Sequence, residues 1–347
     1  MAYTTINKPS EYFNTKLYTG TSSTQSITGV NFQPDLVWFK RRDGVSSHRL
    51  TDAVRGTTKL LQTNANDADQ TGTDTLTSFD SDGFTLGADT APYNVNVSGQ
   101  TMVAWNWKAN GSGVSNTDGS ITSTVSANTT SGFSIVTYTG TGANATVGTG
   151  LGVAPSIVLC KNLSVSGNWI MYHSTQGATK YMVLNATDAV ATATVAWNDT
   201  APTSSVFSVG TASTVNGSGN NLVAYCFAEK KGFSKFGSYT GNGNADGTFV
   251  YTGFKPAFVM IKNTSAAENW YILDNKRPSY NTNNYYIKPN VGDAEGTSTS
   301  LATSLLSNGF KLRTSNDATN QSGATYIYMA FAENPLVNSL GNPATAR

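Results

Sequence analysis

The chain concentrates positive charge in one stretch, residues 40–59, with the sequence KRRDGVSSHRLTDAVRGTTK. Guanidinium and ammonium groups gathered in this way bind carboxylates, phosphates and acidic sugars. The stretch therefore predicts a docking surface for a partner subunit or an acidic glycan. Its candidate docking residues are Lys40, Arg41, Arg42, Arg49, Arg55 and Lys59. The alternative is a solvated loop with Arg55 paired to Asp52, because the spacing Asp-x-x-Arg recurs at Asp274 and Arg277.

Groups that could act as a nucleophile or a base are few. The chain has 2 histidines and 2 cysteines, too few to assemble an ordinary zinc site. His48 and His173 belong to different copies of the repeat described below, and His173 aligns with Asp52 and Asp274. This position is therefore not that of a fixed catalytic base. The cysteines lie in the apolar runs VLCKN and VAYCFAE, so we expect buried free thiols, and we predict no catalytic residue, metal or cofactor.

A pair of carboxylates could hydrolyse glycans, since glycosidases place two carboxyl groups on either side of the glycosidic bond that is cleaved. Asp80 and Asp82 flank a turn before Gly83, while Asp67 and Asp69 lie in NANDAD. The turns that correspond to 80–83 in the other copies, SSV and SNG, carry no acid. We therefore interpret these acids as solvated turn residues, and predict a protein that is not an enzyme.

Exposed aromatic rings could supply a sugar-binding surface of the lectin type. Trp169 and Trp270 occupy equivalent positions beside apolar neighbours, which favours core packing for them. Tyr280, Tyr285 and Tyr286 lie among asparagines in PSYNTNNYYIK, a segment unlike the rest of its repeat. If the protein binds glycans, this loop is the first candidate.

The composition predicts an all-β fold. Charged residues make up 12%, about half of the roughly 25% usual in soluble proteins. Thr, Ser, Asn and Gly replace them, and these residues suit strands and tight turns better than helix interiors. A net charge of +1 gives no reason to expect a nucleic-acid partner. No apolar run approaches the roughly 20 residues that span a bilayer, so we expect no membrane insertion and no cleaved signal.

The sequence repeats itself three times. Tyr-Thr-Gly occurs at 18–20, 138–140 and 239–241, and each copy is followed by a proline and an apolar run: PDLVWFK, PSIVLCK and PAFVMIK. The later runs SDGFTLG, SSVFSVG and SNGFKLR precede VAWNWKA, VAYCFAE and YMAFAEN. A unit of about 100 residues is a normal domain size and too long for a solenoid turn. We therefore expect three tandem β-sandwiches of the jelly-roll or lectin-like kind, arranged as beads in a row.

The expected boundaries follow from these motifs. An N-terminal arm covers 1–12, the first sandwich 13–109, the second 133–231 and the third 232–335, with a C-terminal tail over 336–347. Residues 110–132, NGSGVSNTDGSITSTVSANTTSG, contain no large side chain and are predicted to be a Gly/Ser/Thr-rich linker.

Several long motifs resemble a family of tandem-repeat proteins of marine bacteriophages. They include NKPSEYFNTKLYTG, SSHRLTDAVRG, FDSDGFTLG, VAYCFAE and GFSKFGSYTGNG, and the resemblance covers essentially the whole chain. It implies a virion structural protein of tail-fibre or capsid-appendage type, with no catalytic or binding residues to carry over. The implied location is the exterior of the virion, and the implied partners are other virion proteins.

From the resemblance we expect a tail fibre or appendage that mediates attachment to a bacterial surface glycan. Appendages of this kind are often homotrimers, so a homo-oligomer, with a trimer as one form, is part of that expectation. The alternative is a capsid decoration or assembly protein without receptor binding. A third alternative, a glycan-degrading tailspike, requires a carboxylate pair that the sequence does not offer.

Overall fold

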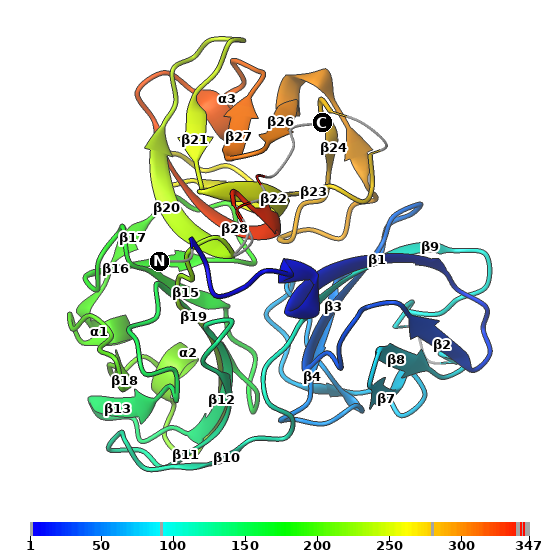
Figure 1. Cartoon of the computed structure of the whole chain (residues 1–347). Helices are drawn as coiled ribbons and strands as arrows, with labels where there is room; N and C mark the ends of the chain where they lie inside the picture. The colour runs from blue at the N-terminus through cyan, green and yellow to red at the C-terminus, as the bar shows by residue number, and fades with distance from the viewer. Residues whose placement is uncertain (1–2, 91–92, 279–280, 338–340, 342, 344–347) are drawn as a thin grey trace.

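Antiparallel strands make up the three lobes of the chain, coloured blue to cyan, green, and yellow to red in Figure 1. The computed structural model describes residues 3–90, 93–278, 281–337, 341 and 343. The predicted all-β fold is confirmed. We refer to residues 13–109, 110–231 and 232–335 as units 1, 2 and 3. No helix of the described part of the chain is long and apolar enough to cross a membrane.

The same strand order occurs in the large sheet of each unit. In unit 1 it is β1 (Phe13–Thr19), β9 (Thr101–Trp107), β3 (Leu36–Arg41) and β4 (Arg49–Asp52). In unit 2 it is β12 (Phe133–Thr139), β19 (Asn221–Phe227), β14 (Ile157–Asn162) and β15 (Ile170–His173). In unit 3 it is β20 (Ser234–Thr240), β28 (Thr325–Pro335), β22 (Phe254–Asn263) and β23 (Trp270–Asp274).

A smaller sheet covers the outer face of each large sheet. Its strands are β2 (Gln25–Thr28), β8 (Gly83–Leu86) and β7 (Leu76–Asp80) in unit 1, β13 (Ala145–Gly148) and β18 (Val206–Val209) in unit 2, and β21 (Phe249–Tyr251), β27 (Gly309–Leu312) and β26 (Thr303–Leu306) in unit 3. Each pair of sheets encloses an outer core of its own.

Short elements complete the fold. The ribbons are β5 (Lys59–Leu60) with β6 (Gln70–Thr71), β16 (Lys180–Val183) with β17 (Ala191–Thr192), and β24 (Tyr285–Tyr286) with β25 (Gly296–Thr297). The helical turns are η1 (Pro9–Glu11), α1 (Thr194–Trp197), α2 (Ser213–Asn216), η2 (Thr299–Leu301) and α3 (Asp317–Asn320).

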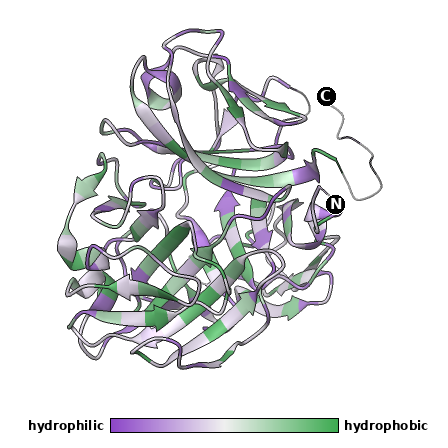
Figure 2. Cartoon of the chain, turned by 60° about the vertical axis from the view of Figure 1, so that its left-hand side comes forward, coloured by the Kyte–Doolittle hydropathy of each residue, from purple (hydrophilic) through white to green (hydrophobic). Residues whose placement is uncertain are grey.

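The large sheets are apolar on both faces, which explains the uninterrupted apolar runs in the sequence. In β3, Val37 and Phe39 face the outer core of unit 1, whereas Leu36 and Trp38 belong to a second core. The same alternation holds in β14 and β22. Side chains of a strand alternate between faces, so a continuous apolar run indicates burial on both sides. Figure 2 shows these hydrophobic positions along the strands, with hydrophilic ones in the connecting loops.

The second core is shared by all three units and lies at the centre of the molecule. It joins Trp105 and Trp107 of unit 1, Phe227 of unit 2, and Phe258 and Phe331 of unit 3. It contains a void of about 20 Å³. The accessible surface is 12020 Å², below the roughly 13,500 Å² typical of a compact monomer of 36.6 kDa. The expectation of beads in a row is therefore wrong, because the three large sheets pack against one another.

The predicted linker is also wrong over much of its length. Residues 110–132 contain β10 (Val114–Asn116) and β11 (Ser123–Asn128), which extend the large sheet of unit 2 beyond β12. Backbone hydrogen bonds pair β11 with β12 and β10 with β11, and such pairing does not require large side chains. The other units have no counterpart of this hairpin in their sheets.

Candidate functional site at the unit junctions

Three lysines lie where the units meet, and Lys40, Lys161 and Lys262 are all 0% exposed. Each Nζ donates to the carbonyl six positions later in its own unit: Ser46 at 2.9 Å, Gly167 at 2.7 Å and Glu268 at 2.9 Å. Each also donates to a carbonyl of another unit: Lys40 to Gly292 at 3.3 Å, Lys161 to Asn66 at 3.0 Å and Lys262 to Thr187 at 2.9 Å. Unit 1 thus binds unit 3, unit 2 binds unit 1, and unit 3 binds unit 2, which closes a ring.

Backbone and ring N–H groups repeat this pattern at every junction. The backbone bonds are Ser46 N to Gly292 O at 2.8 Å, Gly167 N to Asn66 O at 2.7 Å, and Glu268 N to Thr187 O at 2.9 Å. The ring bonds are His48 Nε2 to Lys288 O at 3.0 Å, Trp169 Nε1 to Gln62 O at 2.7 Å, and Trp270 Nε1 to Val183 O at 3.1 Å. The three junctions are therefore built from equivalent contacts around an approximate three-fold arrangement, as the three lobes of Figure 1 suggest.

His48 occupies the position that a tryptophan has in the other two units, and its ring makes the same hydrogen bond across the junction. Trp38 Nε1 donates to His48 Nδ1 at 2.9 Å, and an indole N–H can only donate. Nδ1 is therefore the acceptor, so the ring proton sits on Nε2 and is donated to the Lys288 carbonyl. Burial lowers the His48 pKa well below its usual value, and the nearby Lys40 charge lowers it further. A neutral, fully engaged imidazole of this kind is not available as a catalytic base.

Burial also lowers the pKa of each junction lysine from 10.5 to about 8. The cause is desolvation, which disfavours the charged ammonium, while nearby acids raise the pKa by a smaller amount. Their partners are backbone carbonyl oxygens of the two units, and the carbonyl across each junction also accepts a backbone N–H. Each of these buried lysines therefore donates several hydrogen bonds and so joins loops of two units.

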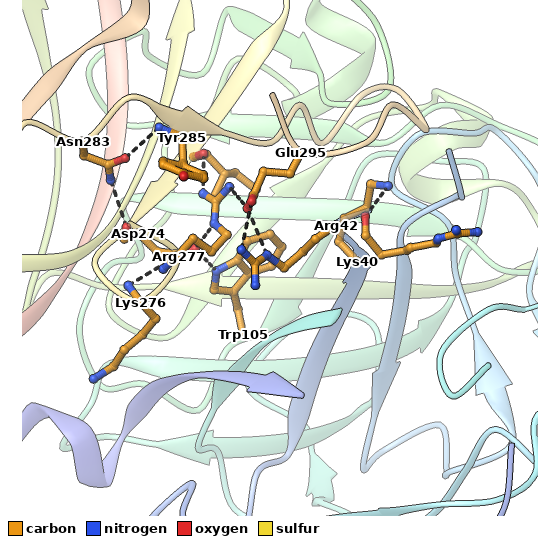
Figure 3. Close-up of polar contacts among 11 residues, drawn as sticks. Lys40, Arg42, Trp105, Asp274, Lys276, Arg277, Asn283, Tyr285 and Glu295 are labelled. Carbon is orange, nitrogen blue, oxygen red and sulfur yellow. Dashed lines mark hydrogen bonds and ion pairs between the residues drawn. The ribbon is translucent and has the colours of Figure 1, made fainter. Parts of the chain in front are cut away.

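Two of the junctions carry, in addition, a buried ion-pair cluster. At the junction of units 3 and 1, Asp274 accepts Arg277 Nε at 2.6 Å and Trp105 Nε1 at 3.0 Å. Glu295 joins Arg277 Nη1 at 3.1 Å to both Arg42 Nε at 3.1 Å and Arg42 Nη2 at 2.9 Å. Asp274 and Arg277 have 0% exposed side chains. Figure 3 shows this chain of contacts running from unit 3 to unit 1.

The junction of units 1 and 2 has the same plan with a tyrosine in place of the tryptophan. Asp52 accepts Arg55 Nε at 2.6 Å and the Tyr225 hydroxyl of unit 2 at 2.7 Å. Arg55 Nη1 also donates to Asp69 at 2.8 Å. Burial raises the pKa of Asp69, although the Arg55 and Lys59 charges lower it. The Asp-x-x-Arg spacing is therefore a structural ion pair at both of its occurrences, as the alternative expected, but the pairs are buried and do not belong to a solvated loop.

The junction of units 2 and 3 lacks this cluster. Its equivalent positions hold His173, Gln176 and Val190, and the strand position matching Trp105 and Tyr225 is Met329. His173 is 1% exposed, and its Nδ1 lies 2.9 Å from the Thr175 hydroxyl. Burial lowers the His173 pKa from 6.5 to about 4. One of the three junctions is thus held without a buried ion pair.

A cleft of about 390 Å³ opens beside the junction of units 1 and 2. Unit 1 supplies Val54, Arg55, Lys59 and Asp69, and unit 2 supplies Leu163, Asn221 and residues of β10, β11 and β12. The unit 2 wall is rich in hydroxyl residues, Ser115, Thr122, Thr124, Thr137 and Thr139, whereas the neighbouring Ser123 and Tyr138 project to the outer core, where the Tyr138 hydroxyl donates to the Val215 carbonyl. Its size lies within the roughly 300–1,000 Å³ usual for ligand sites.

One family model, described as a Domain of unknown function (DUF7483), matches residues 8–335. The chain belongs to this family. The match covers all three units, so the DUF7483 domain of this chain corresponds to the whole ring rather than to a single unit. No curated protein and no solved structure matches the chain.

The predicted docking residues of this DUF7483 domain are mostly internal. Lys40 is fully buried, Arg49 is 7% exposed and the Arg55 side chain is 3% exposed, so the expectation of an external docking surface is wrong for these three. Arg42 crosses to Glu295 of unit 3. Lys59, with a 40% exposed side chain, lines the cleft, and Arg41 pairs with Asp43 at 2.7 Å. The basic stretch therefore serves mainly to join units 3, 1 and 2.

Two of the three candidate glycan-binding tyrosines can be placed, while Tyr280 lies outside the described residues. Tyr285 and Tyr286 form β24 and are half-buried. The Tyr286 ring packs edge-on against Tyr271 at 5.6 Å between centroids. The Tyr285 backbone N–H donates to Asn283, whose amide donates to the Asp274 carbonyl, so this loop is tied to the ion-pair cluster of Figure 3.

The remaining candidates for chemistry in the DUF7483 domain are engaged in the fold. Cys160 and Cys226 are free thiols buried in the outer core of unit 2, as predicted, and burial raises the pKa of both. Asp80 accepts the Ser78 and Thr85 hydroxyls. Asp82 accepts the backbone N–H groups of Gly29 and Asn31. Within the described ranges, no three His, Cys, Asp or Glu side chains gather into a possible metal site.

Sequence reasoning missed Lys161 and Lys262, the internal role that they share with Lys40, and the hydroxyl-lined wall. The lysine was recognisable as a signal, because it closes the apolar run at the same place in all three copies. A charged residue that recurs at the end of a buried strand suggests a shared internal partner. The hydroxyl wall gave no such signal, because β10 and β11 consist mainly of Ser, Thr and Asn.

Proposed function

We propose that this chain is a non-enzymatic structural protein on the exterior of a bacteriophage particle, a tail fibre or appendage that mediates attachment to the host surface. The motif resemblance over essentially the whole chain supports the virion assignment. The ring of three interlocked units supports a mechanical role, because it makes one rigid body with loops and a cleft on its outside.

The proposal that the protein is not an enzyme rests on one observation: its reactive side chains are buried or paired with one another. Both histidines, both cysteines and the junction lysines are buried, and the Asp–Arg clusters satisfy one another. Catalytic groups need access to substrate and a pKa suited to proton transfer or attack. Here burial shifts the pKa values of these groups toward the neutral, inert form.

The cleft argues against the glycan-degrading alternative. Asp69 is the one carboxylate among its lining residues, and it is paired with Arg55 and Lys59. Hydrolysis of a glycosidic bond by the usual mechanism needs two carboxylates, one on each side of the bond. A cleft with one neutralised acid is suited to binding without cleavage.

The proposed partners are other virion proteins and a bacterial surface glycan. The surfaces that join the units are already occupied within one chain. A homo-oligomer, including a trimer, would therefore use the outer surfaces of the units, and the ring itself needs no second chain. In this proposal, folding of the three-unit ring does not depend on oligomer formation.

The test is immunogold labelling of intact particles with antibody against this protein, combined with an adsorption assay. Gold at tail tips or fibres, together with slower phage adsorption to cells preincubated with purified protein, is the expected result. Gold spread over the head would replace the attachment role with that of a capsid decoration protein. No gold on particles whose genome carries the gene would overturn the virion assignment.

A further inference from the structure

We infer that the cleft between units 1 and 2 binds a neutral oligosaccharide through the hydroxyl side chains of β10, β11 and β12. This inference rests on the proposed attachment function and names the ligand class and the site. It depends on where these strands come from, which side chains they present, and what the opposite wall offers.

The cleft lies at the junction where the β10–β11 hairpin of unit 2 stands, and within the described residues the sheets of units 1 and 3 carry no such hairpin. The hairpin extends the large sheet past β12, where the sheets of units 1 and 3 end at β1 and β20. It is not required for the ring, since the junction lysines and ring N–H groups recur without it at the other two junctions. Its addition creates a wall that faces the 54–69 segment of unit 1.

The hydroxyls form an ordered row on this wall. Ser115 lies opposite Thr124, and Thr124 lies opposite Thr137, in the antiparallel pairing of β10, β11 and β12. Directly opposed residues project to the same face of a sheet. The row continues through Val223 to Lys161, which are buried in the centre and at the junction. The hydroxyls thus lie on the face turned toward unit 1, just beyond the point where the shared core ends.

These hydroxyls are free to bind a ligand. The side chains of Ser115, Thr122, Thr124 and Thr137 make no hydrogen bond to any other side chain or backbone group that the structure describes. Each can donate one hydrogen bond and accept others. Because they stand on paired strands, they are held at fixed spacing before a ligand arrives, which lowers the entropy loss on binding.

The opposite wall selects against charged and apolar ligands. Lys59 Nζ lies 3.5 Å from Asp69, and Asp69 also accepts Arg55 at 2.8 Å, so its charges are largely compensated. Val54 and Leu163 supply only a small apolar contact. A ligand that matches must carry closely spaced hydroxyls, little net charge and small apolar faces. A neutral oligosaccharide has this chemistry.

The first experiment screens the full chain on a printed array of bacterial surface oligosaccharides, namely O-antigen, lipopolysaccharide-core and capsular fragments. The affinity of each bound oligosaccharide is then measured by titration calorimetry. The double variant Thr124→Val and Thr137→Val keeps the side-chain shape and removes two hydroxyls. We expect it to weaken binding roughly tenfold or more. The matched control is Thr28→Val, an exposed strand threonine in β2 far from the cleft, which should leave affinity unchanged.

A second variant keeps the test independent of the first. Phe249 and Tyr251 are 42% and 55% exposed on β21 and form an aromatic surface, separate from the cleft, that could stack on sugars. The double variant Phe249→Ala and Tyr251→Ala removes this surface. Binding that survives the valine changes but is lost in the alanine variant would overturn the cleft assignment while leaving attachment intact. An array without any neutral binder would also overturn it, whatever the particle labelling shows. Binding lost only in the valine variant would support it, even if no gold labelled the virion.

Discussion

Trp105 of unit 1 donates its indole N–H to the buried carboxylate of Asp274 in unit 3, at 3.0 Å and across 169 positions of sequence. Tyr225 of unit 2 makes the equivalent contact to Asp52 of unit 1 at 2.7 Å. In units 1 and 2 the same strand position therefore donates to a carboxylate of the neighbouring unit, whereas unit 3 has Met329 there. Such contacts stabilise the ring as a whole and no unit by itself.

Replacing Trp105 by phenylalanine should destabilise the protein more than the same change at Trp107. Both rings are buried in the central core, but Trp107 Nε1 has no hydrogen-bond partner within the described structure. Trp105→Phe loses a hydrogen bond to a charged group, which contributes about 1.5–3 kcal/mol. Urea unfolding measures the difference, and equal free energies of unfolding for the two variants would contradict the role given to the Asp274 contact.

The ion-pair clusters predict a large effect at one junction and a small one at another. Arg277→Met leaves Asp274 without its buried cation, while Glu295 keeps Arg42, and breaking a buried pair typically costs about 3–5 kcal/mol. Gln176→Met changes the equivalent position at the junction of units 2 and 3, where no cluster exists, and should alter the free energy of unfolding little. Similar losses for both variants, measured by equilibrium denaturation, would refute the difference between these junctions.

The junction lysines predict a specific loss of stability on removal of the ammonium group. Lys161→Met leaves the Gly167 carbonyl without its side-chain donor and removes one donor from Asn66, for a loss of about 1–3 kcal/mol. Lys180→Met is the control, because Lys180 is an exposed-surface donor to the Thr192 hydroxyl. A Lys161 variant as stable as the Lys180 variant in the same denaturation experiment would show that the buried bonds contribute nothing.

The buried histidine of unit 2 predicts loss of stability in acid. The pKa of His173 is about 4 in the folded protein against 6.5 when exposed, so the unfolded chain binds the proton first as the pH falls. Its contribution is fully present above pH 6.5 and is lost progressively toward pH 4, by up to about 3 kcal/mol. His173→Gln should flatten the dependence of unfolding free energy on pH over this interval. Parallel curves for the variant and the unchanged protein would rule out this titration.

The strands could be predicted from the sequence, whereas their packing could not be read from the same signals. Runs such as PDLVWFK identified β3, β14 and β22, and the repeated Asp-x-x-Arg spacing identified the structural ion pairs. The uninterrupted apolar character of these runs was the sign of two buried faces, and hence of a shared centre. A strand with one apolar face can lie at the surface with its other face in solvent. Trp38 and Phe39 lie on opposite faces of β3, so both faces must be buried against other parts of the protein.

The hairpin 110–128 and the cleft were not predictable for a different physical reason. Strands of Ser, Thr and Asn carry no hydrophobic periodicity, and their stability comes from backbone pairing with a neighbour distant in space or sequence. Val125, which pairs with Val114 in β10 and with Val136 in β12, provides the two apolar matches of that segment. The docking prediction failed for Lys40 and Arg55 because residue type alone does not show that buried acceptors bind the charge, namely the Gly292 carbonyl of unit 3 for Lys40 and the carboxylates of Asp52 and Asp69 for Arg55.

The most direct test of the closed ring is differential scanning calorimetry of the full chain. Three units that share one core and three equivalent junctions should unfold in a single cooperative transition, with the calorimetric enthalpy equal to the van't Hoff enthalpy. Resolved transitions, or a calorimetric enthalpy several times the van't Hoff value, would mean that the units unfold independently, which would contradict the ring.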